Sequence, residues 1–453
     1  MSYARFALTC VLMCAATARA DDRDDAIFGS EPTPSADAPA PVARPTTALV
    51  DKIAETLSLG GRVELSSAVT KYEDGDAGSA NFSRALLGEL YFDARPNPEF
   101  RSLLRLRVSD GTQSATPGTT LQTDEAWVRF VQNRAVFYTV GKQHLKWGSG
   151  KFWNPTDFLA GESRDPFASF DRRLGTYLLK VHVPQEKQGF NYYALLNMND
   201  AARVNQLSGA LRGEFALFGQ TETALTAAFF SAGSVKLGAD FSAALGPIDA
   251  YVESAFLHKE RRRFYSGRFD PTAGDMPTTV DRSDEWLRQT TAGASYTWKY
   301  ADDDNISFGA EYFDNGLGYS DLTLELYALL SNDAQPLYIG RKYAGGYVRL
   351  AKPGSWNDTT FMLTGLSNLS DRSTTARLTT SWELATATRL EWYLSRCFGE
   401  IGEFCLALPK QYQALADAPS LPGDLPVGFQ ERLRGLPRSK VEVASGLGLT
   451  VEF

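Results

Sequence analysis

The chain has 453 residues, of which 43% are hydrophobic and 12% aromatic, and its formal net charge is -8 at pH 7. This acidic balance argues against a nucleic-acid partner, because phosphate backbones attract basic surfaces. After residue 20 no stretch approaches the ~20 consecutive apolar residues that a membrane helix needs, and the mean hydropathy is -0.25. These properties exclude a helical membrane protein.

Residues 1–20 have the organisation of a secretory signal peptide. Arg5 supplies a short positive region, residues 6–16 an apolar core, and residues 18–20 an A-x-A cleavage site. A lipoprotein signal at Cys14 is the alternative, although the two residues before it are bulky. We therefore expect export across an inner membrane.

Residues 21–56 are predicted to form a periplasmic leader rich in proline and alanine. The run 31–45 contains five prolines, a composition that buries too little apolar surface to fold. Leu49, Ile53 and Leu57 follow at four-residue spacing, which indicates one short helix before the first strand.

From residue 57 to residue 453 the chain consists of amphipathic runs of strand length. The alternation of apolar and polar residues along each run predicts one transmembrane strand per run. The eighteen predicted strands are 57–72, 82–93, 100–110, 123–132, 135–147, 174–184, 188–197, 207–218, 221–231, 235–245, 248–258, 286–300, 305–313, 343–352, 357–368, 374–385, 388–396 and 441–453.

The breaks between these runs alternate in length, as expected when short periplasmic turns alternate with longer external loops. Short breaks such as 133–134 and 246–247 fall at one end, whereas the longest breaks fall at the other. The longest are 148–173, 259–285, 314–342 and 397–440. The sequence therefore predicts an all-β fold, a transmembrane antiparallel barrel of about eighteen strands, with sixteen as the alternative.

The last predicted strand alternates up to the terminal residue. One face carries Val441, Val443, Leu447, Leu449, Val451 and Phe453. This strand resembles the closing strand of Gram-negative outer-membrane β-barrels, whereas an edge strand of a soluble β-protein is the alternative. The resemblance implies an outer-membrane location, contact with outer-membrane lipids, and recognition of Phe453 by the barrel-assembly machinery.

Placing the apolar face of each strand toward lipid puts charged side chains in the lumen, since basic side chains on the lipid face cost a few kcal/mol near the midplane. The predicted pore-lining residues form a basic wall, an acidic counterwall and further late arginines. They are Arg105, Arg107, Arg129, Lys180, Arg212, Glu253, Glu311, Arg349, Arg377 and Arg389. Salt bridges that only stabilise the barrel are the alternative role.

The segment 141–157 carries the most specific local motif. Its pattern, G-x-Q-x-x-x-W-G followed by N-P-x-D, resembles a segment of several porin-like outer-membrane families. The resemblance supports the class without indicating a substrate. The long break that this motif opens is predicted to fold inward as a constriction, with packing on the rim as the alternative; its candidate residues are Trp147, Asn154, Asp157, Glu162, Arg164 and Asp165.

Two further residue types bear on chemistry. Cys397 and Cys405 are predicted to form a disulfide, because an exported chain is oxidised and no histidine lies nearby to complete a metal site. After the signal peptide the chain has three histidines, and none accompanies a recognisable serine or cysteine nucleophile motif. We therefore expect no enzyme activity, no cofactor and no resident metal.

The sequence as a whole predicts a porin-like channel for passive diffusion of small hydrophilic solutes. Two alternatives remain: a plugged barrel whose long loops bind surface polymers or protein partners, and a polysaccharide export pore. The oligomeric state does not follow from the sequence.

Overall fold

The computed structural model describes residues 56–453 apart from gaps at 74–79, 112–117, 161–163, 169, 186, 200, 202, 218–220, 272, 302–303 and 419–424. The predicted signal peptide, and the leader up to residue 55, lie outside the described residues.

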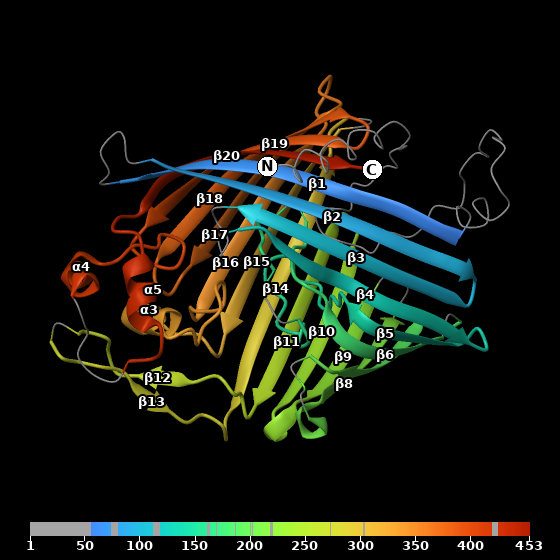
Figure 1. Cartoon of the computed structure of the whole chain (residues 1–453), viewed down its shortest axis with the longest axis horizontal. Coiled ribbons are helices and arrows are strands. Elements are labelled where there is room, and N and C mark those ends of the chain that lie inside the picture. Colours follow the sequence, from blue (N-terminus) through green and yellow to red (C-terminus); the bar gives the residue numbers. More distant parts are fainter. Residues whose placement is uncertain are drawn as a thin grey trace.

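Eighteen antiparallel strands form one sheet that closes on itself (Figure 1), because β1 pairs with both β2 and β20. The predicted all-β barrel fold and its strand number are confirmed. The barrel strands are β1 (Leu57–Tyr72), β2 (Asn81–Asn97), β3 (Phe100–Gly111), β4 (Thr120–Gln132), β5 (Val136–Gln143), β6 (Thr176–Gln185), β7 (Phe190–Asn197), β8 (Ser208–Leu217), β9 (Thr221–Phe229), β10 (Val235–Leu245), β11 (Ile248–His258), β14 (Trp286–Lys299), β15 (Asn305–Asn315), β16 (Lys342–Ala351), β17 (Thr359–Asn368), β18 (Ser373–Ala385), β19 (Thr388–Gly399) and β20 (Val441–Glu452).

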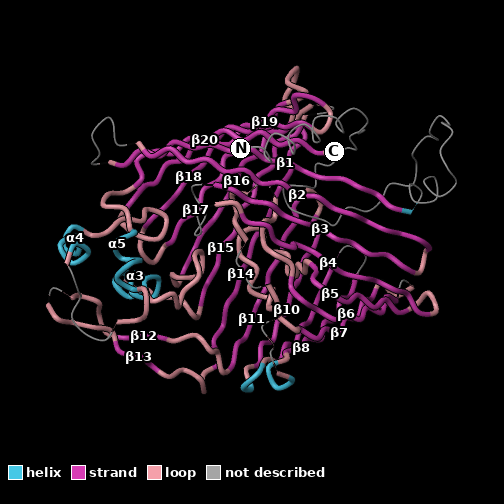
Figure 2. Tube along the Cα trace, viewed as in Figure 1, coloured by secondary structure: helices cyan, strands magenta, loops and turns pink. Residues whose placement is uncertain are grey.

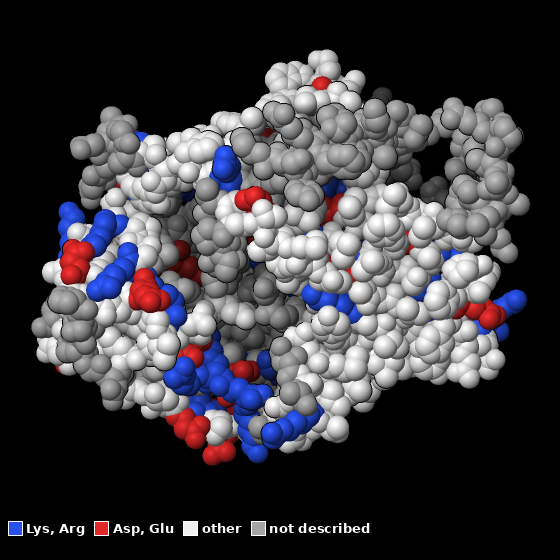
Figure 3. All heavy atoms as spheres, in the orientation of Figure 1, with Lys and Arg blue, Asp and Glu red and all other residues white. Residues whose placement is uncertain are grey.

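The outer face of the barrel is apolar because alternate residues of each strand point outward. On β10 and β11, for example, Phe241 lies opposite Val252 and Leu237 lies opposite Phe256, and all four are exposed. Figure 3 shows few charged side chains over the right-hand part of this face, where β2 to β8 run in Figure 1. Such a surface matches a hydrocarbon environment, in which every strand backbone is paired with its neighbours.

The two ends of the barrel differ, as the break lengths predict. One end has tight turns, including Asn133 and Arg134 with φ of 51° and 53°, the left-handed pair that suits a two-residue hairpin. The other end carries the long connections that follow β5, β11, β15 and β19.

Three of these long connections fold together into a structure that the sequence analysis does not predict. We call it the outer cap: the hairpin β12 (Phe264–Ser266) and β13 (Thr278–Val280), and the helices α3 (Leu322–Leu330), α4 (Lys410–Asp417) and α5 (Phe429–Gly435). Figure 2 shows the three helices and the hairpin gathered at one end of the barrel. Short helices of this length are held by packing rather than by intrinsic propensity, so their sequence signal is weak.

The outer cap has its own apolar core. Phe269, Tyr327, Tyr412 and Phe429 are buried against one another, and they come from three different connections. The side chain of Asp321 caps α3 by accepting a hydrogen bond of 2.8 Å from the backbone N–H of Thr323. None of the helices in the described part of the chain is long and apolar enough to span a bilayer.

Candidate functional site

The connection between β5 and β6, residues 144–175, folds into the barrel, and we call it the inner loop. It departs earlier than predicted, since β5 ends at Gln143 and not at Trp147. Gln143 is buried, and its Nε2 donates a hydrogen bond of 3.3 Å to the carbonyl of Leu178 on β6. The residues that follow run along the inner face of the barrel rather than continuing the sheet.

Glu311 on β15 holds the inner loop through successive backbone groups. Its carboxylate accepts hydrogen bonds from the N–H groups of Lys151 at 2.7 Å, Phe152 at 3.1 Å and Trp153 at 2.8 Å. The hydroxyl of Tyr251 on β11 donates to the same carboxylate. A carboxylate satisfied by several donors is a strong anchor, because charge-assisted hydrogen bonds exceed neutral ones in strength.

Glu253 on β11 forms the second anchor of the inner loop. It accepts hydrogen bonds from the backbone N–H of Gly150 and from the hydroxyl of Thr156 at 3.0 Å. Asn154 of the motif adds a third, from its Nδ2 at 3.3 Å. The same Thr156 hydroxyl lies against Asp240 on β10. The residues of the motif therefore fix the inner loop to strands β10, β11 and β15, and we call this contact region the seat of the inner loop.

Aromatic packing completes this seat. Trp153 is 0% exposed, with its ring centroid 5.8 Å from that of Phe313 and 5.4 Å from that of Tyr343. Phe152 and Trp147 are each 4% exposed, and Trp147 lies under the guanidinium of Arg212 at 5.3 Å. These three aromatic residues are core residues, so they do not offer a stacking surface for sugars.

Gly148 shows how tightly the loop is seated. Its φ is +91°, and an added Cβ would lie 2.6 Å from both oxygens of the Glu253 carboxylate. Gly267 in the outer cap has the same backbone conformation, φ +92°, but its Cβ would meet nothing closer than 4.0 Å.

We expect Gly148→Ala to displace the inner loop and Gly267→Ala to cost only the backbone strain, about 1–3 kcal/mol. Hydrogen–deuterium exchange of residues 148–156 should accelerate in the first variant and remain at the wild-type rate in the second. Equal exchange in both variants would show that the Gly148 contact is dispensable.

The middle of the inner loop reaches the opposite side of the barrel. The guanidinium of Arg377 on β18 lies 4.4 Å from the ring centroid of Phe167 and 4.2 Å from that of Tyr393 on β19. Phe170 lies 3.7 Å from the guanidinium of Arg62 on β1. Cation–π contacts of this kind tie the loop to strands far from its anchors. The inner loop therefore crosses the lumen.

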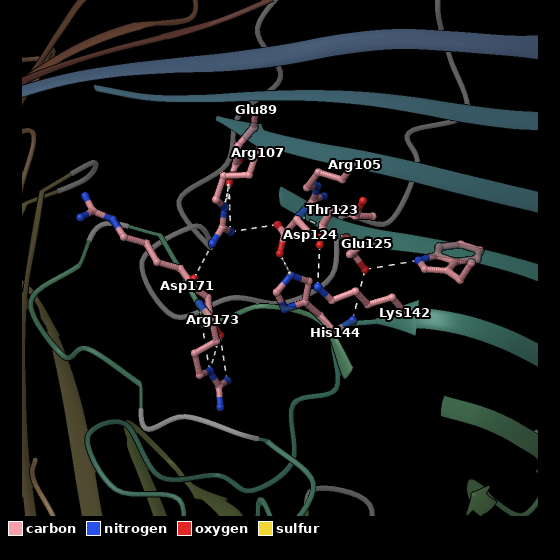
Figure 4. A network of polar contacts seen from close by, with 12 residues as sticks. Glu89, Arg105, Arg107, Thr123, Asp124, Glu125, Lys142, His144, Asp171 and Arg173 are labelled. Carbon is pink, nitrogen blue, oxygen red and sulfur yellow. Dashed lines mark hydrogen bonds and ion pairs between the residues drawn. The ribbon is translucent and has the colours of Figure 1, made fainter. Parts of the chain in front are cut away.

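A network of ion pairs on β1 to β4 receives the end of the inner loop (Figure 4). Arg107 lies at its centre, 3.1 Å from Glu89 and 2.9 Å from Asp124, and its Nη1 donates to the carbonyl of Arg172. Asp124 also contacts His144 Nε2 at 3.1 Å. Both ends of the loop are thus bonded to the same carboxylate–guanidinium network.

An ion pair also joins the end of the inner loop to its middle, because Arg173 lies 2.9 Å from Asp157. Arg173 lies 2.8 Å from Asp171, two residues before it, as well. Burial raises the pKa of Asp157 to about 6, although Arg173 opposes this shift. Burial lowers the pKa of Lys146 to about 8, and the neighbouring Arg164 lowers it further. Burial thus shifts the pKa values of both groups toward neutrality.

The predicted pore-lining residues do not all have the same environment. Arg105 has a side chain that is 33% exposed and pairs with Glu125 at 3.2 Å, whereas four other predicted residues are buried in anchoring contacts. Those four are Arg107, Arg212, Glu253 and Glu311. Glu253 and Glu311 thus lie beneath the inner loop and do not form the open acidic counterwall that we expect from sequence. Alternation along a strand gives the face of a residue but not what covers it.

The remaining predicted residues have intermediate burial: Arg129, Lys180, Arg349, Arg377, Arg389, Asn154, Asp157 and Arg164, whereas Asp165 is exposed. Glu162 lies outside the described residues. Asp240, Tyr251 and Phe167 were missed by the sequence analysis. The inward register of β10 would have identified Asp240, because Lys236 and Asp240 are the two charged residues of β10 and share its inward face.

A polar cavity of about 540 Å³ lies between the inner loop and the outer cap. The inner loop contributes its floor, and residues 332–335 with Tyr338 contribute from the connection that contains α3. Charges of both signs line it: Arg164, Arg173, Lys236, Arg262, Asp157, Glu260 and Asp333. Figure 3 shows lysine and arginine side chains gathered with acidic ones beside a hollow on the lower part of this face.

Cys397 near the end of β19 is bonded to Cys405 in the connection that follows, with a Cα–Cα distance of 5.4 Å. Within the described residues no group of three or more His, Cys, Asp or Glu side chains is arranged to hold a metal ion.

Comparisons with known proteins identify the fold. No family model and no curated protein matches the chain. Among solved structures, Pseudomonas aeruginosa OpdQ superposes with a TM-score of 0.50 at 7% identity, covering 88% of this chain and 98% of OpdQ. The fold is porin-like. P. aeruginosa OccK5 (OpdH) has a TM-score of 0.48 at 12% identity over 88% of this chain and 99% of its own. A porin of Rhodopseudomonas blastica has a TM-score of 0.42 at 12% identity over 88% and 100%.

Proposed function

We propose that the protein is an outer-membrane channel through which small hydrophilic solutes diffuse passively. The observation that carries this proposal is the inner loop, which crosses the lumen of a closed barrel and is bonded to the wall by Glu253 and Glu311. A loop fixed inside a barrel narrows the passage and sets its width. The mechanism is selection by size and charge, without chemistry or energy input.

The cavity above the inner loop supports this proposal, because its lining suits small polar solutes. About 540 Å³ lies within the usual range for a small-molecule site. Basic and acidic side chains are paired along its lining, since Lys236 lies 3.4 Å from Glu260 and Arg173 lies 2.9 Å from Asp157. Such a lining offers charged and hydrogen-bonding groups of both signs to a polar solute.

We also propose that the barrel-assembly machinery of a Gram-negative bacterium recognises the C-terminal strand. Phe453 ends the chain next to β1, where its N–H donates to the carbonyl of Gly61 at 3.0 Å and its carbonyl accepts from the N–H of Gly61 at 2.8 Å. Deleting Phe453 should lower the amount of assembled barrel in cells, measured as the heat-modifiable band on gels, and an unchanged amount would contradict the proposal.

Planar-bilayer recording of the refolded protein under a salt gradient tests the channel itself. We expect stable conductance steps, and a shift of the reversal potential toward cation selectivity in Arg105→Ala, because the Arg105 side chain is 33% exposed whereas Arg107 and Arg212 of the basic wall are buried. Arg203→Ala is the matched control, since Arg203 is exposed on the connection after β7.

A correctly folded barrel that gives no conductance would overturn the diffusion proposal. A selectivity shift of equal size in Arg203→Ala would show that the shift does not depend on where the arginine lies. The assignment of Arg105 to the pore wall would then be wrong.

A further inference from the structure

Three acidic side chains from different connections meet around one asparagine beneath the outer cap. Asn368, at the end of β17, is 0% exposed, and its Nδ2 lies 3.2 Å from Glu325, 3.0 Å from Asp371 and 3.2 Å from Glu403. Glu325 belongs to α3, Asp371 to the turn between β17 and β18, and Glu403 to the connection after β19. We call this group the carboxyl cluster.

The carboxyl cluster has more acceptors than donors. An asparagine amide has two N–H bonds to offer, so it cannot satisfy three carboxylates at once. The other donors act on Asp371 and Glu403: Ser373 N–H at 2.7 Å and Glu403 N–H at 2.7 Å reach Asp371, and the Tyr343 hydroxyl at 2.7 Å reaches Glu403. Glu325 is only 3% exposed, and its Oε1 has no donor.

No cation within the described part of the chain compensates these carboxylates. None of them forms an ion pair with a described residue. The nearest basic residues along the chain are Arg341, Lys342, Arg372, Arg396 and Lys410, and the last two are exposed. Arg341 pairs with Asp314 instead, and Lys342 and Arg372 are exposed. Buried charges without counter-ions are costly, and a proton removes the cost by turning one carboxylate into a donor.

A metal ion is a poorer occupant than a proton, because the Asn368 amide directs its N–H groups at the carboxylates. The Oδ1 of Asn368 cannot exchange places with them freely, since it accepts the backbone N–H of Ser370 at 2.9 Å. The centre of the cluster therefore presents a donor where a metal would need another oxygen.

The carboxyl cluster is connected to the inner loop through the backbone of Leu337. The N–H of Leu337 donates to Glu403, and its carbonyl accepts from Trp153 Nε1 at 3.0 Å. The next residue, Tyr338, accepts from the N–H of Asn154 at 3.2 Å and lines the cavity. One short segment thus joins the cluster, the cavity and the seat of the inner loop.

We propose that the carboxyl cluster is a proton-dependent latch, which holds α3 and the segment at Leu337 against the barrel when it is protonated and releases them when it ionises. The latch itself stands on the geometry above; only its consequence for solute entry, a wider access to the cavity at higher pH, rests on the proposed channel function.

The direction of the pH response follows from linkage. Burial raises the pKa of Glu403 to about 7, and burial together with Asp371 and Glu403 raises the pKa of Glu325 to about 10. Acids with raised pKa values bind protons more tightly in the latched state than in the released state. Latching is therefore fully favoured below the ordinary carboxyl pKa of 4.5. It weakens as the pH rises to about 7 through Glu403 and Glu325 together, and above that pH through Glu325 up to about 10.

Hydrogen–deuterium exchange of α3, corrected for the intrinsic exchange rate, tests the latch on the refolded full barrel in detergent. Between about pH 5.5 and about pH 8.5 we expect the protection of α3 to fall about tenfold or more, since each unit of pKa difference changes the equilibrium tenfold. The double variant Glu325→Gln, Glu403→Gln removes both carboxyl groups with raised pKa values and should reduce this change to less than about twofold. Glu431→Gln on α5, an exposed carboxylate of the same cap, should respond as the wild type does.

Equal protection of wild-type α3 at both pH values would overturn the latch, whether or not the barrel conducts. A wild-type response in the double variant Glu325→Gln, Glu403→Gln would also overturn it. If millimolar calcium at about pH 8.5 restores the protection that wild-type α3 has at about pH 5.5, the cluster is a cation site and the proton latch is wrong. Because the wild-type series needs no variant, the test survives a variant that fails to fold.

Discussion

Glu311→Ala is expected to release the inner loop and to raise single-channel conductance severalfold. The substitution leaves the backbone N–H groups of Lys151, Phe152 and Trp153 without their acceptor, together with the hydroxyl of Tyr251. Each buried donor without a partner costs ~1–3 kcal/mol. A loop that moves toward water recovers these hydrogen bonds, so the seated conformation loses its advantage.

Planar-bilayer recording measures this effect, and trypsin cleavage at Lys151 reports the loop independently of conduction. Glu222→Ala on β9 is the control, because Glu222 is an exposed strand carboxylate. If Glu311→Ala conducts as the wild type does and resists trypsin equally, Glu311 is not the anchor that its hydrogen bonds indicate.

The sequence predicts the barrel well because the alternation of side chains that defines a barrel strand is a local property of the sequence. Apolar and polar residues must alternate along each strand, so that apolar side chains face the lipid and polar ones face the lumen. This pattern can be recognised directly in the sequence. The eighteen strands and the sorting of long and short connections follow from it. The boundary of β5 was wrong because residues 144–147 keep the alternation of polar and apolar residues, although Leu145 and Trp147 pack inside the barrel.

The outer cap and the carboxyl cluster could not be predicted in the same way. Phe269, Tyr327 and Tyr412 meet only after connections far apart in sequence come together, and no periodic pattern records such contacts. Glu325 and Glu403 are likewise ordinary acidic residues until folding places them around Asn368. The motif 141–157 was recognisable, but its partners Glu253 and Glu311 lie more than ninety residues away.

The alternation of residues along a strand also does not show how deeply a lumenal side chain is buried. Arg105 and Arg107 are two residues apart on β3 and point to the same side, so the sequence assigns them one role. In the structure the Arg105 side chain is 33% exposed, whereas that of Arg107 is 7% exposed and bridges two carboxylates. Arg105 therefore belongs to the lumen wall, whereas Arg107 has a structural role, although both lie on the same strand.

Arg107→Ala should consequently destabilise the barrel far more than Arg105→Ala. Removing one partner of a buried ion pair costs about 3–5 kcal/mol. We expect the lower end of this range, because Glu89 would still contact Arg62 and Asp124 would still contact His144. Arg105→Ala should cost about 1 kcal/mol or less, as partly exposed pairs do. Urea unfolding of the refolded barrels, followed by tryptophan fluorescence, compares the two midpoints.

Arg107→Lys refines this comparison, since lysine keeps the charge but lacks the planar fork that reaches Glu89, Asp124 and the Arg172 carbonyl together. Its midpoint should fall between those of the wild type and Arg107→Ala. Equal midpoints for Arg105→Ala and Arg107→Ala would mean that water reaches both guanidinium groups alike. The network on β1 to β4 would then be part of the open pore wall, and the inner loop would have to be held by Glu253 and Glu311 without it.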